Sequence, residues 1–287
     1  MKVKIIESIF IILFVLLFVL FLKMVVMTTY TDGFQQKECH IFIYDNSTTT
    51  TRTKNLEILL SKLNYPYKIV GKGEEWKGWY GRWNTYIDEI NKIEDKDAYV
   101  CLLDGRDVLI TQPYSEFIKK ATNQYEDKII VGAEEHCCNI GNEFENREND
   151  KERHNYVNDI KTYFQNINPD KSNKYHYVNF GTLFGKCKDF IQINEIMNMR
   201  PGYDDQGTFI QRIMEKKIQN YQLDYKHNIF SVLFELPKWD KETQNYYNEH
   251  TNTFPSIFHF PAKTGIYVDC AKGLFKKWEI DENLFVD

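Results

Sequence analysis

The chain has 287 residues, which is enough for one large α/β domain or two small ones. Hydrophobic residues make up 43% of the sequence and aromatic residues 15%, so there is ample material for a buried core and a disordered chain is excluded. The formal net charge is -5, and Lys and Arg are scattered among Asp and Glu. Because no basic block occurs, a surface that binds nucleic acid is not indicated.

The first thirty residues contain a long apolar run. Residues 5–27 read IIESIFIILFVLLFVLFLKMVVM. A helix of this length, at about 1.5 Å per residue, spans the ~30 Å hydrocarbon core of a bilayer. The residues that follow offer no small-residue cleavage site, which favours an uncleaved anchor over a signal peptide. We therefore expect a transmembrane helix and a short stem in residues 1–30, and a single-pass type II protein that faces the lumen of the endoplasmic reticulum or Golgi.

From residue 38 onward the sequence alternates between predicted strands and helices, as is typical of an α/β domain. A short apolar run at 39–45 precedes a segment with helical spacing of leucines at 56–63, and a second run follows at 67–71. Further along, the patterns predict helices at 82–93 and 204–217. They also predict strands at 97–110, 128–135 and 175–186, the first interrupted by a polar turn. This order predicts a Rossmann-like, mostly parallel sheet flanked by helices, in one domain over residues 31–287.

The segment YVCLLDGRDVLI carries two carboxylates at the end of a predicted buried strand. Asp104 and Asp107 are separated only by Gly105 and Arg106. Ligands of open α/β sheets bind beyond the carboxyl ends of the strands, and carboxylates suit Mg²⁺ or Mn²⁺, which commonly bridge them to a diphosphate. The pair therefore fits a clamp for a metal ion and a diphosphate. From these four residues alone, an Asp-rich turn that closes the strand fits at least as well.

Three further features are ambiguous when each is taken alone. Asp204 and Asp205 precede a predicted helix, where carboxylates suit either a site or the N-terminal cap of the helix. Glu134 ends a predicted strand. His259 lies in the apolar run IFHF, where a histidine is more often a satisfied core residue than a ligand. None of these features decides the function by itself.

The succession of motifs resembles the glycosyltransferase domain of the procollagen lysyl hydroxylases and its relatives among the collagen glycosyltransferases and the large viruses. GKGEEWKG, from residue 71 to 78, is similar to the G-x-G-x-x-W-x-G turn of that family, and LLDGRDVLI to its D-x-x-D strand. The later matches, in chain order, are GAEEHCC, VNFGTLFGK, YDDQGTFI, LDYKHNIFSVL and FHFPAKTG. Seven matches in order, over residues 71–265, are far more specific than any single string.

The resemblance implies a GT-A fold that uses a UDP-sugar and Mn²⁺ (or Mg²⁺). The metal ligands that it implies are Asp104, Asp107 and His259. Arg106 stands where the family has an aromatic residue that stacks on uracil, and the implied contacts to the nucleotide are Trp76, Arg106, Lys263 and Gly265. The implied catalytic residues, on the sugar and acceptor side of the cleft, are Asp204, Asp205, Glu134 and Asn179.

The sequence thus predicts a membrane-anchored, metal-dependent glycosyltransferase that moves glucose or galactose from a UDP-sugar to a hydroxyl group. The resemblance implies a hydroxylysine-linked glycan on a collagen-like protein as the acceptor, and the host secretory pathway as the location if the chain is a viral stand-alone relative. Two alternatives remain open. One is a transferase of the same fold with a different donor and a glycan acceptor. The other is a catalytically inactive, anchored domain that binds glycans or scaffolds a partner enzyme.

Overall fold

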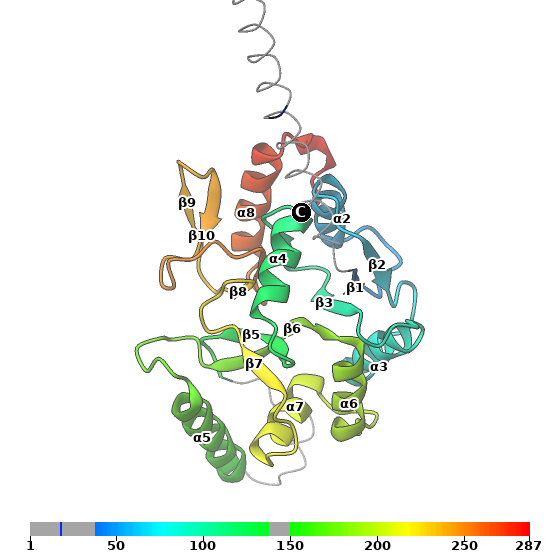
Figure 1. Cartoon of the computed structure of the whole chain (residues 1–287), viewed down its shortest axis with the longest axis vertical. Helices are drawn as coiled ribbons and strands as arrows, with labels where there is room; N and C mark the ends of the chain where they lie inside the picture. Colours follow the sequence, from blue (N-terminus) through cyan, green and yellow to red (C-terminus); the bar gives the residue numbers. More distant parts are fainter. Residues whose placement is uncertain (1–17, 19–37, 138–149) are drawn as a thin grey trace, which may run out of the picture. The chain divides into compact units, whose positions relative to one another are not determined.

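The computed structural model describes residues 18, 38–137 and 150–287 (Figure 1). The predicted membrane anchor and stem, residues 1–30, lie outside the described residues apart from Phe18. Within the described ranges, no helix combines the length and the apolar character that a bilayer-spanning segment needs. Residues 38–287 form one compact unit, and the features below all belong to it.

The centre of this unit is a six-stranded sheet with the strand order β2-β1-β3-β6-β5-β7 (Figure 1). Its strands are β1 (Cys39–Tyr44), β2 (Tyr67–Val70), β3 (Tyr99–Asp104), β5 (Ile129–Glu134), β6 (Tyr177–Lys186) and β7 (Tyr221–Leu223). The neighbours β2, β1 and β3 pair in parallel, and so do β5 and β7. The prediction of an α/β fold whose sheet contains parallel strands is therefore confirmed.

One strand departs from the parallel arrangement. β6 runs antiparallel to both of its neighbours, β3 and β5. The amide of His176 donates to the carbonyl of Glu134 at 3.1 Å, so the chain re-enters the sheet at the end where β5 stops. Because β6 begins beside the last residue of β5, it has to run in the opposite direction.

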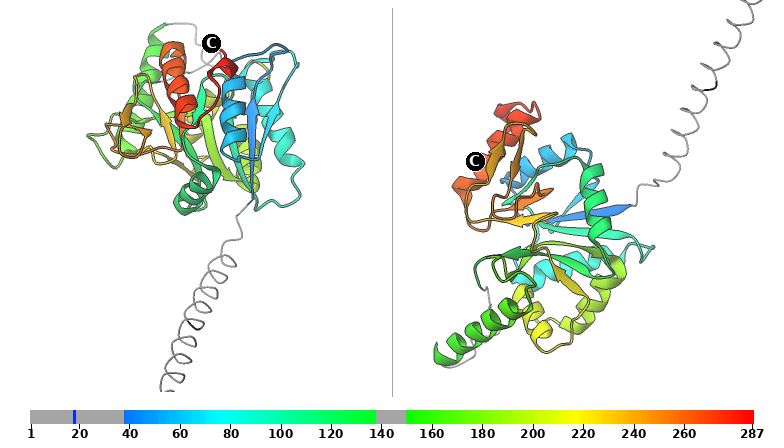
Figure 2. Two further views of the ribbon diagram at one scale, coloured as in Figure 1. Left: turned by 90° about the horizontal axis from the view of Figure 1, so that it is seen from above. Right: turned by 60° about the vertical axis from the view of Figure 1, so that its left-hand side comes forward.

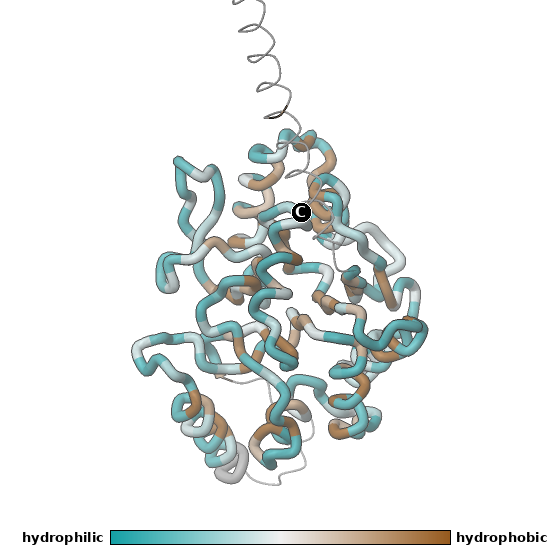
Figure 3. The backbone as a smooth tube through the Cα atoms, viewed as in Figure 1, coloured by the Kyte–Doolittle hydropathy of each residue, from teal (hydrophilic) through white to brown (hydrophobic). Residues whose placement is uncertain are grey.

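A second, three-stranded sheet carries the other residues of interest. It consists of β4 (Val108–Ile110), β11 (Ile257–His259) and β8 (Phe230–Val232), with β11 in the middle. β11 pairs antiparallel with β4 and parallel with β8. The predicted strand at 97–110 is thus divided between two sheets, because the turn 105–107 carries the chain from β3 to β4. A hairpin of β9 (Lys238–Asp240) and β10 (Asn245–Tyr247) forms a separate two-stranded sheet and is mostly hydrophilic (Figure 3).

Helices pack on both faces of the central sheet, as Figure 2 shows from two further directions. The α-helices of the described residues are α2 (Thr53–Lys62), α3 (Gly78–Asn91), α4 (Tyr114–Gln124), α5 (Asp150–Ile167), α6 (Cys187–Met197), α7 (Asp205–Met214) and α8 (Thr264–Lys277). Of these, α5 packs against α7, and α8 packs beside β4 of the second sheet. Successive residues of β3 point to opposite faces. Val100 and Leu102 join the core with α3, α6 and α7, whereas Cys101 and Leu103 join the core with α2 and α4. The continuous apolar run of β3 follows from this burial on both faces.

A buried carboxylate connects the two sheets. Asp224 follows β7, and its side chain accepts hydrogen bonds from the backbone amides of Ile229 and Phe230, at 2.7 and 2.9 Å. Phe230 opens β8, which pairs with β11. Buried polar groups are costly unless they are hydrogen-bonded, so these contacts hold the second sheet in a defined place beside the first. The position of His259, the last residue of β11, depends on this junction.

Candidate active site

The ends of three strands meet beside the turn between the two sheets. Asp104 is the last residue of β3, and Asp107 directly precedes β4. The antiparallel register of β4 and β11 sets Val108 opposite His259, and the amide of Phe260 donates to the carbonyl of Asp107 at 2.9 Å. Backbone pairing alone therefore brings residue 259 next to residue 107, although 152 positions of sequence separate them (259 minus 107).

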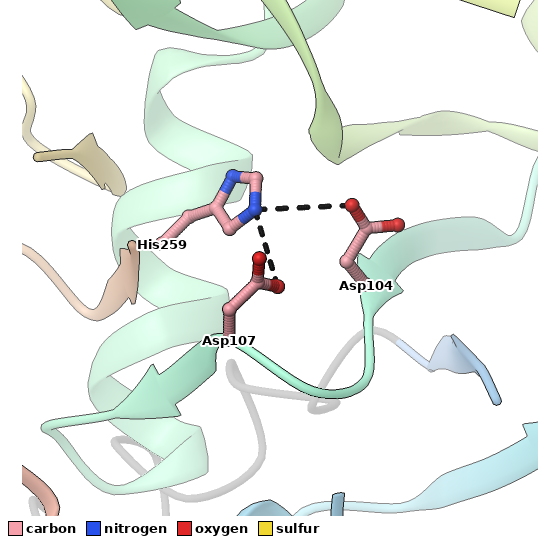
Figure 4. Close-up of side chains that lie close together, drawn as sticks. All are labelled: Asp104, Asp107 and His259. Carbon is pink, nitrogen blue, oxygen red and sulfur yellow. Dashed lines mark ion pairs between the residues drawn. The ribbon is translucent and has the colours of Figure 1, made fainter. Parts of the chain in front are cut away.

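The side chains of Asp104, Asp107 and His259 point toward one another (Figure 4). The imidazole Nε2 of His259 lies 3.3 Å from Asp107 Oδ1 and 3.8 Å from Asp104 Oδ2. One ligand atom from each of the three residues lies within 4.8 Å of the others. This set of two carboxylates and one imidazole is a donor set that divalent ions such as Mn²⁺ accept.

The state of His259 supports a metal ion at this place. Its Nε2 is buried and makes no hydrogen bond to any of the described residues. Its other nitrogen, Nδ1, lies 2.8 Å from the amide oxygen Oδ1 of Asn179. Because that oxygen is an acceptor, Nδ1 carries a proton, and Nε2 is the atom at which a metal ion or a second proton can bind. A buried nitrogen that faces two carboxylates and makes no hydrogen bond to the described residues fits a cation as its ligand.

Electrostatics in the cluster also favour a positive charge. Burial of the His259 imidazole by itself lowers its pKa, but the neighbouring carboxylates of Asp107 and Asp104 outweigh burial and raise it. Burial likewise raises the pKa of Asp107, but the facing His259 outweighs this effect and lowers it. The site therefore attracts either a proton or a metal ion at Nε2, and the two compete.

A glycine in β6 leaves room for this cluster. A Cβ atom on Gly181 would lie 2.2 Å from His259 Cε1 and 2.8 Å from Asp104 Oδ2. Contacts under 3.0 Å require the neighbours to move, and here the neighbours are two of the predicted metal ligands. A glycine at position 181 of the segment VNFGTLFGK is therefore required sterically, because the backbone of β6 passes close to the cluster.

The buried carboxyl group of Glu134 lies beside the cluster. It accepts hydrogen bonds from Asn179 Nδ2 at 3.3 Å and Gln206 Nε2 at 3.4 Å, which are long for hydrogen bonds. Burial raises the pKa of Glu134 to about 7. A carboxyl group that titrates near neutral pH and lines a cavity is suited to accept or donate a proton there.

The predicted acidic pair lies at the start of α7. Asp204 is the N-cap, and its Oδ1 accepts from the amide of Gly207 at 2.6 Å, so it has the capping role that the sequence allowed. Asp205 is buried and bonded to the guanidinium of Arg82, with Nε and Nη2 of Arg82 at 2.8 to 2.9 Å from its oxygens. Both aspartates also line a cavity that contains His259. Capping and lining a site are therefore not exclusive roles here.

Two adjoining cavities open at the strand ends. The one that we call the strand-end cavity has a volume of about 620 Å³ and contains Trp76 and Arg106 in its lining. The histidine cavity, of about 460 Å³, contains His259 and the four predicted catalytic residues Asp204, Asp205, Glu134 and Asn179. The two cavities share four lining residues, Trp79, Arg82, Asp104 and Asp107. The two cavities therefore adjoin at Asp104 and Asp107, and together we call them the cleft.

Of the four residues predicted to contact the nucleotide, two line the cavities and two do not. Trp76 is 46% exposed, and its ring lies 5.9 Å from that of Tyr44 in the strand-end cavity. Arg106 donates from Nε and Nη2 to Asp45 Oδ1, at 3.2 and 3.0 Å. Lys263 precedes α8, with its ammonium 5.8 Å from the ring centroid of Phe234 in the histidine cavity. Neither Lys263 nor Gly265 is among the described residues that line the two cavities.

A comparison with known protein families shows the family to which the chain belongs. The family described as "PLOD GT domain" matches residues 46–275. The chain belongs to this family. It is a glycosyltransferase domain, and the resemblance that the motifs predicted is confirmed. The matched range contains every residue of the cleft discussed above apart from Tyr44 and Asp45. No curated protein matches the chain.

Solved structures include distant neighbours of this glycosyltransferase domain. A glycosyltransferase involved in the glycosylation of the major capsid of PBCV-1 is 12% identical, with a TM-score of 0.46, over 83% of this chain and 99% of its own. The apo form of mouse xyloside xylosyltransferase 1 is 12% identical, with a TM-score of 0.34, over 74% of this chain and 73% of its own.

Sequence reasoning missed Arg82, the residue that links the two sides of the glycosyltransferase cleft. A signal was present in the predicted helix. Arg82, Tyr86 and Ile90 follow one another at intervals of four and share the buried face of α3. A charged residue on the apolar stripe of a helix is almost never buried unless it is paired. Gln206 was also missed, and its side-chain oxygen accepts from the amide of Phe180 at 2.9 Å.

Gly181→Ala is expected to abolish binding of a divalent cation at the cluster, because the added methyl group displaces His259 and Asp104. A ligand that binds only the native state raises Tm, so Mn²⁺ should raise the Tm of the unaltered protein but not that of the variant. Gly185→Ala, on the same strand but facing Ile129, is the control and should keep the Mn²⁺-dependent rise. An equal rise in Gly181→Ala would contradict the assignment.

Glu134→Gln is expected to change how stability depends on pH. The pKa of Glu134 is raised from 4.5 to about 7 in the folded protein, so stability from its protonation is full below pH 4.5 and is lost as pH rises through 7. In EDTA-containing buffer, raising the pH from 5 to 8 should lower the free energy of unfolding of the unaltered protein, relative to that of the variant, by on the order of 3 kcal/mol.

Urea unfolding at the two pH values measures this difference. Glu126→Gln, which alters an exposed glutamate, serves as the control and should follow the unaltered protein at both pH values. Parallel pH profiles for Glu134→Gln and the unaltered protein would show that the Glu134 carboxyl group is ionised throughout this range.

Proposed function

We propose that this glycosyltransferase transfers a hexose, glucose or galactose, from a UDP-sugar to a hydroxyl group in a reaction that depends on Mn²⁺ or Mg²⁺. The observation that supports this proposal most directly is the buried Nε2 of His259. It has no hydrogen-bond partner among the described residues and faces two carboxylates, at 3.3 and 3.8 Å. Such a nitrogen is costly to bury unless a ligand engages it.

In this proposal Asp104, Asp107 and His259 hold the metal ion at the junction of the two cavities. A divalent cation bound there supplies Lewis-acid neutralisation of the charge that develops on the departing diphosphate. The nucleotide occupies the strand-end cavity, where Trp76 offers an exposed ring and Arg106 a guanidinium that Asp45 holds in place. Lys263 and Gly265 lie outside the lining residues, at the start of α8, and the ammonium of Lys263 lies near Phe234 of the histidine cavity.

The sugar and the acceptor hydroxyl then occupy the histidine cavity. Its lining includes the carboxyl groups of Glu134, Asp204 and Asp205. Burial raises the pKa of both Asp205 and Glu134 to about 7. Asp205 is engaged by Arg82 and Asp204 caps α7, whereas Glu134 accepts two long hydrogen bonds from the described residues. We infer that Glu134 is the group that takes the proton of the acceptor hydroxyl, since a general base works best with a pKa near the working pH.

The acceptor that we propose is a protein or glycan hydroxyl, with a hydroxylysine-linked glycan on a collagen-like protein as the case that the family suggests. The location that we propose is the lumen of the endoplasmic reticulum or Golgi, with residues 1–30 as the membrane anchor. Residues 5–27 are apolar and long enough to span a bilayer, which supports the anchor.

A donor assay with the full chain in detergent tests the proposed activity. UDP release from UDP-glucose or UDP-galactose, with Mn²⁺ and collagen-derived acceptors, should be lost in EDTA. His259→Gln should lower it about 100-fold or more, because it removes a metal ligand. His250→Gln, which alters an exposed histidine paired with Glu235, should keep it. Mn²⁺ binding without turnover of either donor would instead support the inactive glycan-binding or scaffolding domain.

A further inference from the structure

The guanidinium of Arg82 lies at the junction of the two cavities and lines both of them. Its side chain is only 5% exposed. Nη1 donates to Asp104 Oδ1 at 2.5 Å, while Nε and Nη2 both face Asp205. The Cζ atom of Arg82 lies over the ring of Trp79, 4.4 Å from its centroid. Two edges of the guanidinium are thus held by carboxylates, as the planar geometry of arginine allows, and Trp79 packs beside the group.

These contacts divide the two oxygens of Asp104 between two partners. Oδ1 accepts from Arg82, and Oδ2 is the oxygen that lies 3.8 Å from His259 Nε2. A carboxylate oxygen that accepts a charge-assisted hydrogen bond is a weaker metal ligand than one that does not. Arg82 therefore fixes the orientation of Asp104 and makes Oδ2 the oxygen that faces the cluster.

Asp205 determines which N–H groups of the Arg82 guanidinium can bind Asp104. Three hydrogen bonds, all between 2.8 and 2.9 Å, bind the Nε and Nη2 edge of Arg82 to the Asp205 carboxylate. Arginine and a carboxylate readily pair through two parallel hydrogen bonds. If Asp205 did not occupy that edge, the guanidinium would be free to engage both oxygens of Asp104 and to compete with the metal ion for Oδ2.

We propose that Arg82 is a positioning residue of the metal site, held by Asp205 so that it takes Oδ1 of Asp104 and leaves Oδ2 for a divalent cation. This inference rests on the proposed function, and it assigns to Asp205 a role that needs no contact with the ion. It predicts that the effect of Asp205 on metal affinity is transmitted through Arg82. A simple effect of negative charge would act whether or not the guanidinium is present.

A double-mutant cycle on Mn²⁺ affinity separates these two cases, because coupling between residues appears as non-additivity. The free-ion signal in electron paramagnetic resonance gives the Kd for Mn²⁺ of the full chain, without any assay of activity. Asp205→Asn should raise the Kd about tenfold or more when Arg82 is present. The same substitution in an Arg82→Met background should raise it by no more than about threefold, which is the share left for charge alone.

Arg82→Lys completes the test, because it keeps the charge but loses the fork that reaches two carboxylates, and it should also raise the Kd about tenfold. Arg212→Lys is the matched control, since Arg212, in the last turn of α7, pairs with Glu215 and does not line either cavity, and it should leave the Kd unchanged. Equal effects of Asp205→Asn in the two backgrounds would overturn the inference while the metal site stands. No Mn²⁺ binding by the unaltered protein would overturn both.

Discussion

The site depends on one short turn that carries the chain from the central sheet into the second sheet. Residues 105–107 connect β3 to β4, and β4 pairs with β11 in a register that sets Val108 opposite His259. A Cβ atom on Gly105 would lie 2.7 Å from Thr53 Oγ1 and 2.8 Å from the carbonyl of Tyr44, so the turn passes tightly over the end of β1. Backbone pairing and this tight turn are therefore sufficient to bring two carboxylates and an imidazole together.

Around the cluster, buried polar groups fix the side chains on both sides. Asn179 connects His259 to Glu134, and Arg82 connects Asp104 to Asp205. Asn179 binds Nδ1 of His259 and leaves Nε2 facing the centre of the cluster, and Arg82 binds Oδ1 of Asp104 and leaves Oδ2 facing it. The cleft is thus pre-organised for the cation and the diphosphate of the function that we propose. The same buried acidic groups destabilise the fold when they are ionised without a partner, and this gives a physical reason for the raised pKa of Glu134.

Much of this arrangement was predictable from the sequence, and there are physical reasons why the rest was not. The buried run of β3 and the amphipathic helix α7 were visible as patterns, and the ordered motifs identified the family. The antiparallel direction of β6 was not, because strand direction depends on where the preceding segment returns the chain. The role of Arg82 was missed for a similar reason, since its partners Asp104 and Asp205 come from other elements and only the fold brings them together.

The central claim is that His259 coordinates a divalent cation together with Asp104 and Asp107. Electron spin-echo envelope modulation of Mn²⁺ bound to the full chain in the presence of UDP tests it directly, because a coordinated imidazole nitrogen modulates the echo. We predict nitrogen modulation in the unaltered protein and its loss in His259→Gln. Bound Mn²⁺ without nitrogen modulation, or with modulation that survives in His259→Gln, would contradict the claim.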